Sequence, residues 1–452
     1  MVIALKESLT KYWRYTENKM IINNKMLVEQ LNSFVNKYLM PLMALAFLSM
    51  NTVFDIWIGN RVETVQNILG VPIILIFIYS FTYKPKETII AWIKQNTFIL
   101  VYFGVRFASF VATGFDYSVI RSIFFEIVFL MCINKTFISV DKKGTYIKLF
   151  MCFEFLITFI GFILYYASKV FGETFYNFLE SITFIAQSER AILYGNVNTA
   201  GIVAGFAVVV AVAVYNSNLF NKKIVALYGA YNFIAMLLYG CRSADVGILV
   251  SFVAFLIVVI VPKCNRQLLT MVIIVTMTLS VIPIYGAVEI FGQDNNYELT
   301  DMEHKLNDLS TGRYMIWKEC YMMQQEQPLL GYGSLRLERE ARQTFFSDLG
   351  SDYWRYEEAA QIAPHNGYIG ILSATGILGL VAFVLVMLDK IKKSNLMRTG
   401  FWYLIPVYIF AVNCFESTFI LNRFVAFFFM LVILSMDFLK IDEKECIKGG
   451  DK

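Results

Sequence analysis

Apolar segments of the length that crosses a bilayer recur along almost the whole of this chain. Hydrophobic residues make up 58% of its 452 residues and charged residues only 16%, far from the balance of a water-soluble protein. Segments in lipid must satisfy their backbone hydrogen bonds internally, and runs of about twenty residues do so as helices. We therefore predict an all-α polytopic membrane protein with about twelve transmembrane helices. The predicted helices begin near Tyr38, Ile68, Thr97, Ser118, Tyr146, Thr199, Ile224, Val246, Leu268, Gly367, Phe401 and Phe424.

Lysine and arginine cluster at every second junction between these helices, and such residues stay on the cytoplasmic side. The alternation predicts cytoplasmic termini, and the polar, basic start of the chain predicts no cleaved signal peptide. This topology accounts for the net charge of +4 without nucleic-acid binding. The chain then divides into a cytoplasmic tail (1–37), transmembrane helices 1 to 9 (38–290), a large extracytoplasmic loop (291–366), transmembrane helices 10 to 12 (367–440) and a cytoplasmic tail (441–452).

The predicted outer loop contains two helical patterns. In "STGRYMIWKECYMMQQEQPLLGYG", Ser310 or Thr311 can cap an amphipathic helix that Pro328 ends. The apolar stripe of this helix consists of Ile316, Cys320 and Met323. A second helical stretch is expected at about 351–361. A loop of this length with helices of its own is typical of a functional subdomain.

Arginine is the most informative residue type on the predicted outer side, where Arg190, Arg242 and Arg313 lie at the ends of helices or in the loop. Guanidinium groups bind phosphate in a bidentate way and stay charged at physiological pH. Several of them at one cleft would neutralise a pyrophosphate leaving group without a metal. Each also has an ordinary interpretation as a solvated or paired surface charge. The candidate partners for such pairs are Glu189, Asp245 and Glu319.

His365, one of only two histidines, follows Pro364, which suits the first turn of a helix. The positive end of a helix dipole disfavours an imidazolium, so we expect a neutral ring that can accept a proton from a hydroxyl. A satisfied polar cap is the alternative interpretation. The other histidine, His304, lies in a polar stretch and is expected to be solvated.

Buried charges elsewhere point to structure rather than chemistry. Arg106 and Glu126 lie mid-span in consecutive predicted helices, where a lone charge is costly, so we expect them to pair.

The seven cysteines are scattered, and the acids of the loop match no metal-ligand spacing, so neither a metal nor another cofactor is expected. Nucleotide-binding and soluble-hydrolase motifs are absent from the sequence. Three further acids remain unassigned: Glu154, Glu289 and Glu416.

Three stretches resemble the bacterial O-antigen ligase and polymerase superfamily. His365 and Asn366, followed by Gly376 and Gly379, resemble its HN…GxxG pattern. The stretch "TGRYMIWKECYMMQQEQPLLGYG" is similar to its pattern of small residue, Gly, Arg, an aliphatic–Trp pair, Pro and Gly-x-Gly. More weakly, "ERAILYGNVNTAG" and "CRSADVG" resemble its Asn-Pro-Asn and Ser-Arg elements. The chain departs from the family where valine replaces the proline of Asn-Pro-Asn, at position 197, and where threonine stands for serine, at position 311.

The resemblance implies a GT-C-type membrane glycosyltransferase of a bacterial inner or plasma membrane. Its donor would be an undecaprenyl-pyrophosphate-linked oligosaccharide, and in a polymerase the acceptor would be a second lipid-linked repeat unit. It would work in the bilayer with a flippase and a chain-length regulator as possible partners. His365, Arg313 and Arg242 would be catalytic. The residues expected to bind pyrophosphate or glycan are Arg190, Asn198, Asn366, Arg336 and Arg339.

Several functions remain open at this point. The composition, rich in Asn, Lys, Ile and Phe, favours a capsule or exopolysaccharide polymerase over an O-antigen ligase. A ligase that transfers glycan to a lipid core or to a protein shares the same pattern. A flippase for lipid-linked oligosaccharides is the alternative from another class. Such a transporter should carry charges along its spans, whereas the arginines here concentrate at their outer ends.

Overall fold

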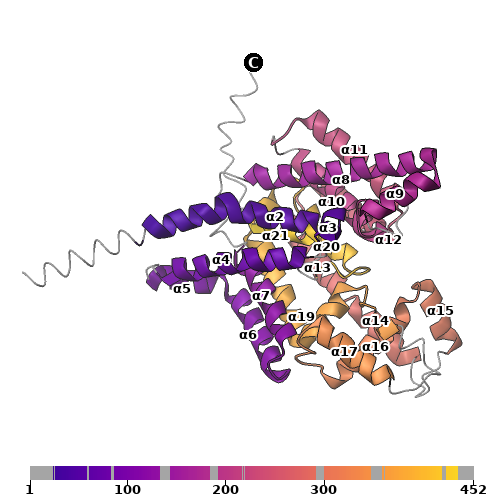
Figure 1. Ribbon diagram of the computed structural model, residues 1–452. Helices are drawn as coiled ribbons and strands as arrows, with labels where there is room; N and C mark the ends of the chain where they lie inside the picture. The colour runs from indigo at the N-terminus through magenta and orange to yellow at the C-terminus, as the bar shows by residue number, and fades with distance from the viewer. Residues whose placement is uncertain are drawn as a thin grey trace, which may run out of the picture.

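The computed structural model describes residues 24, 26–58, 61–82, 86–132, 143–183, 192–215, 217, 219–291, 300–347, 359–360, 362–419 and 424–435. Within this part of the chain the protein is helical, and the only extended pairing is an isolated bridge between Thr52 and Tyr194 (Figure 1). The helices are η1 (Val35–Leu39), α2 (Met40–Ser49), α3 (Val53–Trp57), α4 (Val62–Thr82), α5 (Lys86–Gln95), α6 (Thr97–Ala112), α7 (Tyr117–Cys132), α8 (Lys143–Phe171), α9 (Glu173–Thr183), α10 (Val197–Tyr215), α11 (Lys222–Tyr239), α12 (Arg242–Ile260), α13 (Arg266–Thr278), α14 (Val281–Phe291), α15 (Asp301–Leu309), α16 (Arg313–Glu326), α17 (Leu335–Ser347), α19 (Gly367–Lys393), η4 (Asn395–Arg398), α20 (Leu404–Val412) and α21 (Val425–Ser435).

Seven helical segments of the described chain are long and apolar enough to cross a bilayer. This confirms an all-helical polytopic membrane protein. Each predicted starting point lies in a helix or within three residues of one, but several of these helices are short: α20 has 9 residues and α21 has 11. The total of twelve crossings therefore stays a prediction. The seven segments are Met26–Ser49, Val62–Thr82, Gly144–Phe171, Val197–Tyr215, Arg242–Ile260, Arg266–Phe291 and Gly367–Lys393.

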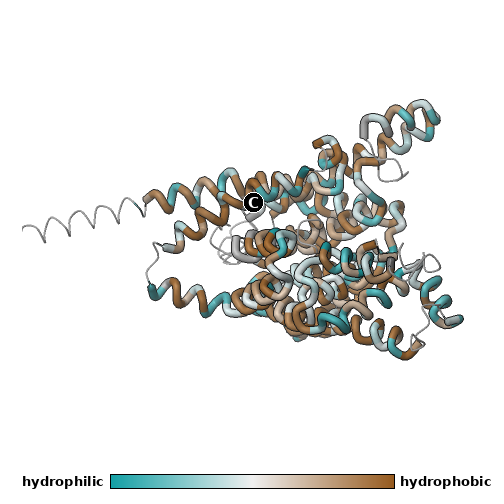
Figure 2. Tube along the Cα trace, turned by 60° about the horizontal axis from the view of Figure 1, so that its bottom comes forward, coloured by the Kyte–Doolittle hydropathy of each residue, from teal (hydrophilic) through white to brown (hydrophobic). Residues whose placement is uncertain are grey.

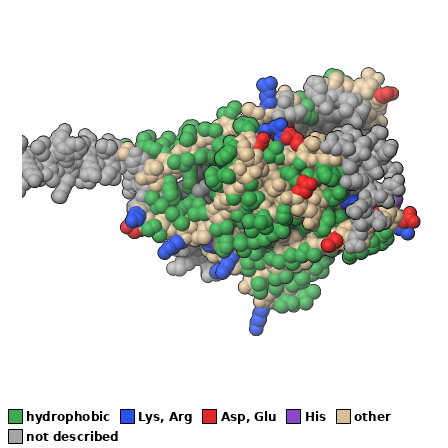
Figure 3. All heavy atoms as spheres, turned by 90° about the horizontal axis from the view of Figure 1, so that it is seen from below, with side chains coloured by type: hydrophobic (Ala, Val, Ile, Leu, Met, Phe, Trp, Pro, Cys, Tyr) green, Lys and Arg blue, Asp and Glu red, His purple; other side chains and the backbone are tan. Residues whose placement is uncertain are grey.

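The centre of the bundle is formed by α10, α20 and α21. All nine residues of α20 are buried, and α10 and α21 bury side chains on every side, as expected for helices that are hydrophobic all round. The surrounding helices leave large apolar side chains exposed. Figure 2 shows that hydrophobic residues predominate along much of the bundle. Figure 3 shows hydrophobic side chains spread over much of one face, with few charges among them. Because water would disfavour such a surface, it fits contact with lipid.

Glycines allow the central helices to approach one another closely. A Cβ atom on Gly201 of α10 would lie 2.3 Å from the Cβ of Cys241, which directly precedes α12. One on Gly205 would lie 2.3 Å from the Tyr408 hydroxyl of α20. Small residues are common at helix contacts in membranes because packing there depends on close approach. These contacts hold the first turn of α10 beside the start of α12.

The helices α15, α16 and α17 lie together beside α14 and the start of α19 (Figure 1). The predicted helix after Thr311 is confirmed as α16, which buries its apolar stripe and ends before Pro328. Its expected cap is wrong, because Gly312 occupies the N-cap position with φ +83°. Ser310 instead accepts a hydrogen bond from the Tyr314 amide at 2.8 Å. The second predicted stretch lies outside the described residues, apart from helical residues 359–360.

A buried charge cluster joins α16 to α17. Arg342 of α17 lies 3.2 Å from a carboxylate oxygen of Glu319 and 2.6 Å from one of Glu338, and all three side chains are at most 1% exposed. Arg342 also donates to the Ile362 carbonyl at 2.9 Å, which ties the cluster to the segment before His365. Burial raises the pKa of Glu319 to about 8 despite the neighbouring guanidinium.

We expect Glu319→Gln to flatten the dependence of stability on pH. The folded protein keeps the Glu319 proton up to about pH 8, whereas an unfolded chain releases it near pH 4.5. The folded state thus binds more protons in this window, and stability falls as the pH rises through it. The Tm of Glu319→Gln should change less than that of wild type over this range. Glu326→Gln, exposed at the end of the same helix, is the control. A Tm profile of Glu319→Gln that matches wild type would contradict the assignment.

The segment after α16 inserts between α6 and a break in α19. Gly376 has φ +67° and ψ −176°, which only glycine adopts readily, and the Ile377 amide donates to the Pro328 carbonyl at 3.0 Å across the break. On the other side, Ser109 donates to Leu330 and Arg106 donates to Gly333, each at 2.9 Å. The two glycine-containing patterns of the sequence therefore pack against each other.

The expected pairing of Arg106 with Glu126 is confirmed. The Arg106 Nε lies 2.7 Å from a Glu126 carboxylate oxygen, and the guanidinium is fully buried. Because the same guanidinium donates to the Gly333 carbonyl, the ion pair also fixes the segment between α16 and α17. A lone guanidinium at this depth would be costly, so we interpret the pair as structural.

Replacing Gly376 with alanine should destabilise the protein by about 3 kcal/mol or more. A Cβ atom there would lie 2.1 Å from the Leu329 carbonyl oxygen, and the backbone conformation disfavours any side chain. The matched control is Gly104→Ala in α6, where a Cβ would meet nothing within 4 Å. Thermal unfolding in detergent measures both variants. Equal Tm values for the two would contradict this account of the break.

Candidate functional site

The carboxylate of Glu416 is the shared partner of three polar side chains from three different helix starts. Its Oε1 accepts from Arg313 Nη2 at 3.0 Å and from Asn198 Nδ2 at 3.1 Å. Its Oε2 lies 3.0 Å from His365 Nδ1. Asn198 belongs to the first turn of α10, Arg313 begins α16, and His365 directly precedes the N-cap of α19. The structure thus brings three of the predicted site residues together around one acid.

The turn that follows α20 holds Glu416 in place. The Glu416 amide donates to the Val412 carbonyl at 3.0 Å, and the Asn413 side chain accepts from both the amide and the hydroxyl of Thr418. The start of α19 docks on the same turn, because the Gly367 amide donates to the Asn413 carbonyl at 2.9 Å. Any side chain at Gly367 would collide with Asn413. His365 and Glu416 are therefore fixed relative to each other.

Asn366 positions this pair rather than facing open space. It is the N-cap of α19, where its side-chain oxygen accepts from the amides of residues 368 and 369. Its amide nitrogen donates to the Cys414 carbonyl at 3.0 Å, and the residue is fully buried. A positioning role thus fits better than the predicted ligand contact. Pro364 lies outside the helix, so its expected place in the first turn is wrong, because Asn366 supplies the cap.

The backbone on either side of the site is held in unusual conformations. His365 has φ +48°, in the left-handed region that few non-glycine residues occupy, and Thr311 before Arg313 has φ +56°. The Trp317 indole donates to the Pro364 carbonyl at 2.8 Å, so α16 clamps the segment that carries His365. Arg313 also donates to the Phe415 carbonyl at 2.8 Å. Such strained conformations persist where the surrounding contacts fix the backbone, and they are common at functional sites.

The contact with Glu416 orients the histidine ring. An ionised carboxylate only accepts hydrogen bonds, so it favours a proton on Nδ1 and leaves Nε2 of the neutral ring as an acceptor. The His365 side chain is 36% exposed, whereas that of Glu416 is 8% exposed. The neutral ring expected from the sequence stays a prediction. The pair can take a proton from an incoming hydroxyl at Nε2.

Arg242 is the exposed first residue of α12. Its neighbour Cys241 donates to the Asn198 carbonyl at 3.5 Å, so the start of α12 lies next to the Asn198 side of the site. The N-termini of α10, α12, α16 and α19 therefore surround Glu416 and its partners, and helix N-termini favour bound anions. Arg190 lies outside the described residues.

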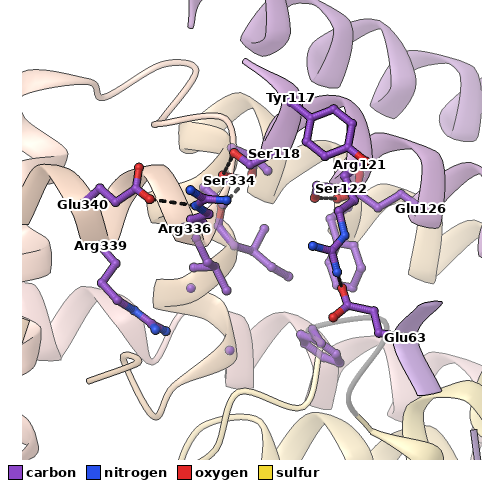
Figure 4. A pocket seen from close by; sticks show the side chains of 18 of the residues that line it. Glu63, Tyr117, Ser118, Arg121, Ser122, Glu126, Ser334, Arg336, Arg339 and Glu340 are labelled. Atoms are coloured by element: carbon purple, nitrogen blue, oxygen red, sulfur yellow. Dashed lines mark hydrogen bonds and ion pairs between the residues drawn. The ribbon is translucent and has the colours of Figure 1, made fainter. Parts of the chain in front are cut away.

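Arg336 and Arg339 lie in a different place from Arg313. Both belong to α17 and line a cavity of about 570 Å³ between α7, α17 and α19, whose lining includes neither His365 nor Glu416 (Figure 4). Arg336 forms an exposed ion pair with Glu340 at 2.7 Å. The structure therefore does not gather all of the predicted glycan-binding residues at one centre.

Glu416 is the central residue that the sequence left unassigned. The available signal was an acid in "AVNCFESTF", within one of the most apolar regions of the chain. An acid in such surroundings is costly without a partner, and its partners are often functional. The identity of those partners depends on contacts between residues up to 218 positions apart, such as Asn198 with Glu416.

We expect Glu416→Gln to lower the activity of this site by about 10²-fold or more, because the amide favours the wrong histidine tautomer and weakens the contact with Arg313. The variant is nearly isosteric, so the protein should still be expressed and inserted, with a lower Tm because the ion pair with Arg313 is lost. Glu289→Gln, at an exposed acid near the end of α14, serves as the control. Wild-type activity of Glu416→Gln would show that the reaction does not need the Glu416 carboxylate.

Comparison with known families finds one family model that matches part of the chain. Residues 227–384 match the family model described as O-antigen ligase, a range that contains Arg242, Arg313 and His365. This part of the chain, about a third of its length, is therefore similar to the O-antigen ligase and polymerase superfamily. No curated protein matches the chain. Glu416 lies beyond the range that the O-antigen ligase model matches.

Proposed function

We propose that this protein is a GT-C-type glycosyltransferase that polymerises undecaprenyl-pyrophosphate-linked oligosaccharide repeat units on the outer face of the membrane. The product would be a capsular, exopolysaccharide or O-antigen chain. One observation carries the proposal: a guanidinium and an imidazole contact the same carboxylate, where four helix N-termini meet. This arrangement offers cationic groups for a leaving diphosphate and a proton acceptor within one site.

The diphosphate of the donor would be held by Arg313 and Arg242, with the amide of Asn198 and the surrounding helix N-termini as further donors. Arg313 is 22% exposed on its side chain, so it can reach a ligand while it keeps its contact with Glu416. A guanidinium matches the geometry of phosphate oxygens. Arg190, which lies outside the described residues, stays a predicted member of this set. Guanidinium groups and amides would stabilise the leaving group without a metal.

In the proposed reaction, the oxygen of an acceptor hydroxyl attacks the anomeric carbon of the donor glycan. The new bond joins this oxygen to the anomeric carbon, while the bond from that carbon to the diphosphate oxygen breaks. The lipid diphosphate keeps the bonding electrons, and the hydroxyl proton passes to His365 Nε2. A single displacement of this kind inverts the anomeric centre. Glu416 keeps the ring oriented and stabilises the positive charge that it gains.

The proposal includes a topology. We place residues 291–366 outside the membrane as the large loop, with both termini in the cytoplasm and the site on the outer side. Residues 38–290 and 367–440 would form the two transmembrane parts, between cytoplasmic tails at 1–37 and 441–452. The amphipathic helices of the loop and the alternation of basic junctions support this arrangement. A flippase would supply the repeat units, and a chain-length regulator is a further proposed partner.

Polymerisation is preferred to ligation on composition, because chains rich in Asn, Lys, Ile and Phe are typical of AT-rich genomes, many of which encode capsules. Transport is the candidate from another class. The convergence of Arg313, His365 and Glu416 at helix starts favours an enzyme over a flippase, whose charges should follow a path through the bundle.

Cells that lack this protein separate these functions. If it is the polymerase, single lipid-linked repeat units should accumulate on the outer leaflet, where a membrane-impermeant aldehyde-reactive label reaches them after mild oxidation. If it is a transporter, the units stay inside and unlabelled, and the proposal fails. Membranes that contain the wild-type protein should continue to elongate chains in a chelator. Complete loss of elongation there would contradict neutralisation by arginine alone.

A further inference from the structure

The cavity between α7, α17 and α19 has the size of a ligand site, and we call it the α7–α17 cavity. Its volume is about 570 Å³, within the range of pockets that hold small molecules. Figure 4 shows polar side chains from α7 facing others from α17 across it. The start of α19 and Glu63 of α4 complete its wall.

Charges around the α7–α17 cavity are balanced. The lining contains three arginines and three glutamates: Arg121, Arg336, Arg339, Glu63, Glu126 and Glu340. Arg121 pairs with Glu63, and Arg336 pairs with Glu340. Glu126 pairs with Arg106, which lies behind the lining. A diphosphate would require cations that carboxylates do not already neutralise. Sugar hydroxyls both donate and accept hydrogen bonds, so they suit a wall on which guanidinium and carboxylate groups alternate.

Hydroxyl and aromatic groups complete a surface suited to sugar. The hydroxyls of Ser118 and Ser334 lie 2.9 Å apart, one from each side of the cavity, and Ser122 donates to Glu126 at 3.1 Å. Phe383 and Phe419 line the apolar part, with ring centroids 5.0 Å apart. Sugars present polar edges and apolar C–H faces, and this cavity offers partners for both.

The α7–α17 cavity borders the site around Glu416. Gly367, which lines it, is two residues after His365, and Phe419 is three residues after Glu416. The segments that carry the histidine and the acid thus also form part of the cavity wall. A glycan held in the cavity would approach the start of α19, where His365 lies.

We propose that the α7–α17 cavity is a second carbohydrate subsite, which holds the neutral sugars of the acceptor repeat unit while the diphosphate of the donor lies at Arg313. This inference rests on the proposed function. It assigns the two substrates to different places: the donor diphosphate to the cationic centre and the acceptor glycan to the charge-balanced cavity. The two sites should therefore respond independently to substitution.

The test measures binding of the free repeat-unit oligosaccharide, released by mild acid from the lipid-linked pool of the same cells and radiolabelled, to the full-length protein in nanodiscs. Gln343→Trp on α17 and Ala374→Trp on α19 should each weaken binding at least tenfold, because both residues line the cavity. The matched control is Thr344→Trp, at an exposed residue of α17 outside the lining. Arg313→Ala, at the residue assigned to the donor diphosphate, should bind the neutral oligosaccharide as wild type does.

The outcomes separate the subsite from the proposed function. Binding that is lost in both cavity variants and kept in Arg313→Ala supports the subsite. An absence of binding to wild type, equal loss in Thr344→Trp, or loss confined to Arg313→Ala overturns it, even if chains still elongate. Failure of wild type to elongate lipid-linked units, with oligosaccharide binding intact, counts against the polymerase alone.

Discussion

Replacing His365 with alanine is expected to lower chain elongation by at least about 10³-fold. Of the imidazole and the carboxylate of the described site, the imidazole is the group placed to take the hydroxyl proton. The carboxylate of Glu416 is buried behind it and bonded to three partners. The protein should still insert, because His365 is partly exposed and precedes α19 without forming part of it. Single repeat units should still reach the outer leaflet.

The measurement is polysaccharide length on gels from cells that express each variant at equal levels. His304→Ala is the matched control, because it removes the other histidine, exposed on α15 of the same region, and should leave elongation unchanged. His365→Gln should be as inactive as His365→Ala, since an amide can form hydrogen bonds but cannot take the proton. Normal chains from His365→Ala would exclude the histidine as the base.

Replacing Arg313 with alanine should reduce elongation by about 10²-fold to 10³-fold, the scale on which one preorganised donor to a developing charge contributes. The guanidinium donates both to Glu416 and to the Phe415 carbonyl, so its position is fixed before substrate binds. Its loss also leaves the Glu416 carboxylate, which is 8% exposed, without its cationic partner. We therefore expect a lower Tm together with lower activity.

Arg313→Lys separates the two effects. Lysine keeps a positive charge beside Glu416 and so restores much of the stability, but it cannot bind a diphosphate in a bidentate way, and elongation should stay at least tenfold below wild type. Lys305→Ala, at an exposed residue of α15, is the surface-charge control. Wild-type elongation by Arg313→Ala at an equal expression level would show that this arginine does not contact the leaving group.

The transmembrane helices could be predicted because their cause is local. Each apolar run satisfies its own backbone, and α16 follows from its apolar stripe and Pro328, although its cap is Gly312 rather than the predicted Ser310 or Thr311. The N-cap of α19 was missed because the prediction relied on Pro364. The cap is Asn366, whose amide also reaches the turn after α20 through a contact that no local pattern reveals. The break at Gly376 depends on the segment from Pro328 to Gly333, which no local pattern pairs with it.

The candidate site was predicted only in part. Arg313 and His365 stand out by residue type, as rare cationic or titratable groups in an apolar chain. Glu416 stands out in the sequence only as an acid in an apolar region, and its tertiary contacts are what assign it a role. Arg336 and Arg339 were predicted by residue type, but they belong to α17 and to a different cavity. The location of a charge in the sequence does not reveal which groups it faces.

The most direct test uses purified protein in nanodiscs and a lipid-pyrophosphate-linked repeat unit as the only substrate. The products are separated on a gel after incubation with wild type, His365→Ala and Arg313→Ala. The account predicts a ladder of lengths for wild type and a single band for both variants. A single unchanged band with wild type, or the same ladder from all three proteins, would contradict it.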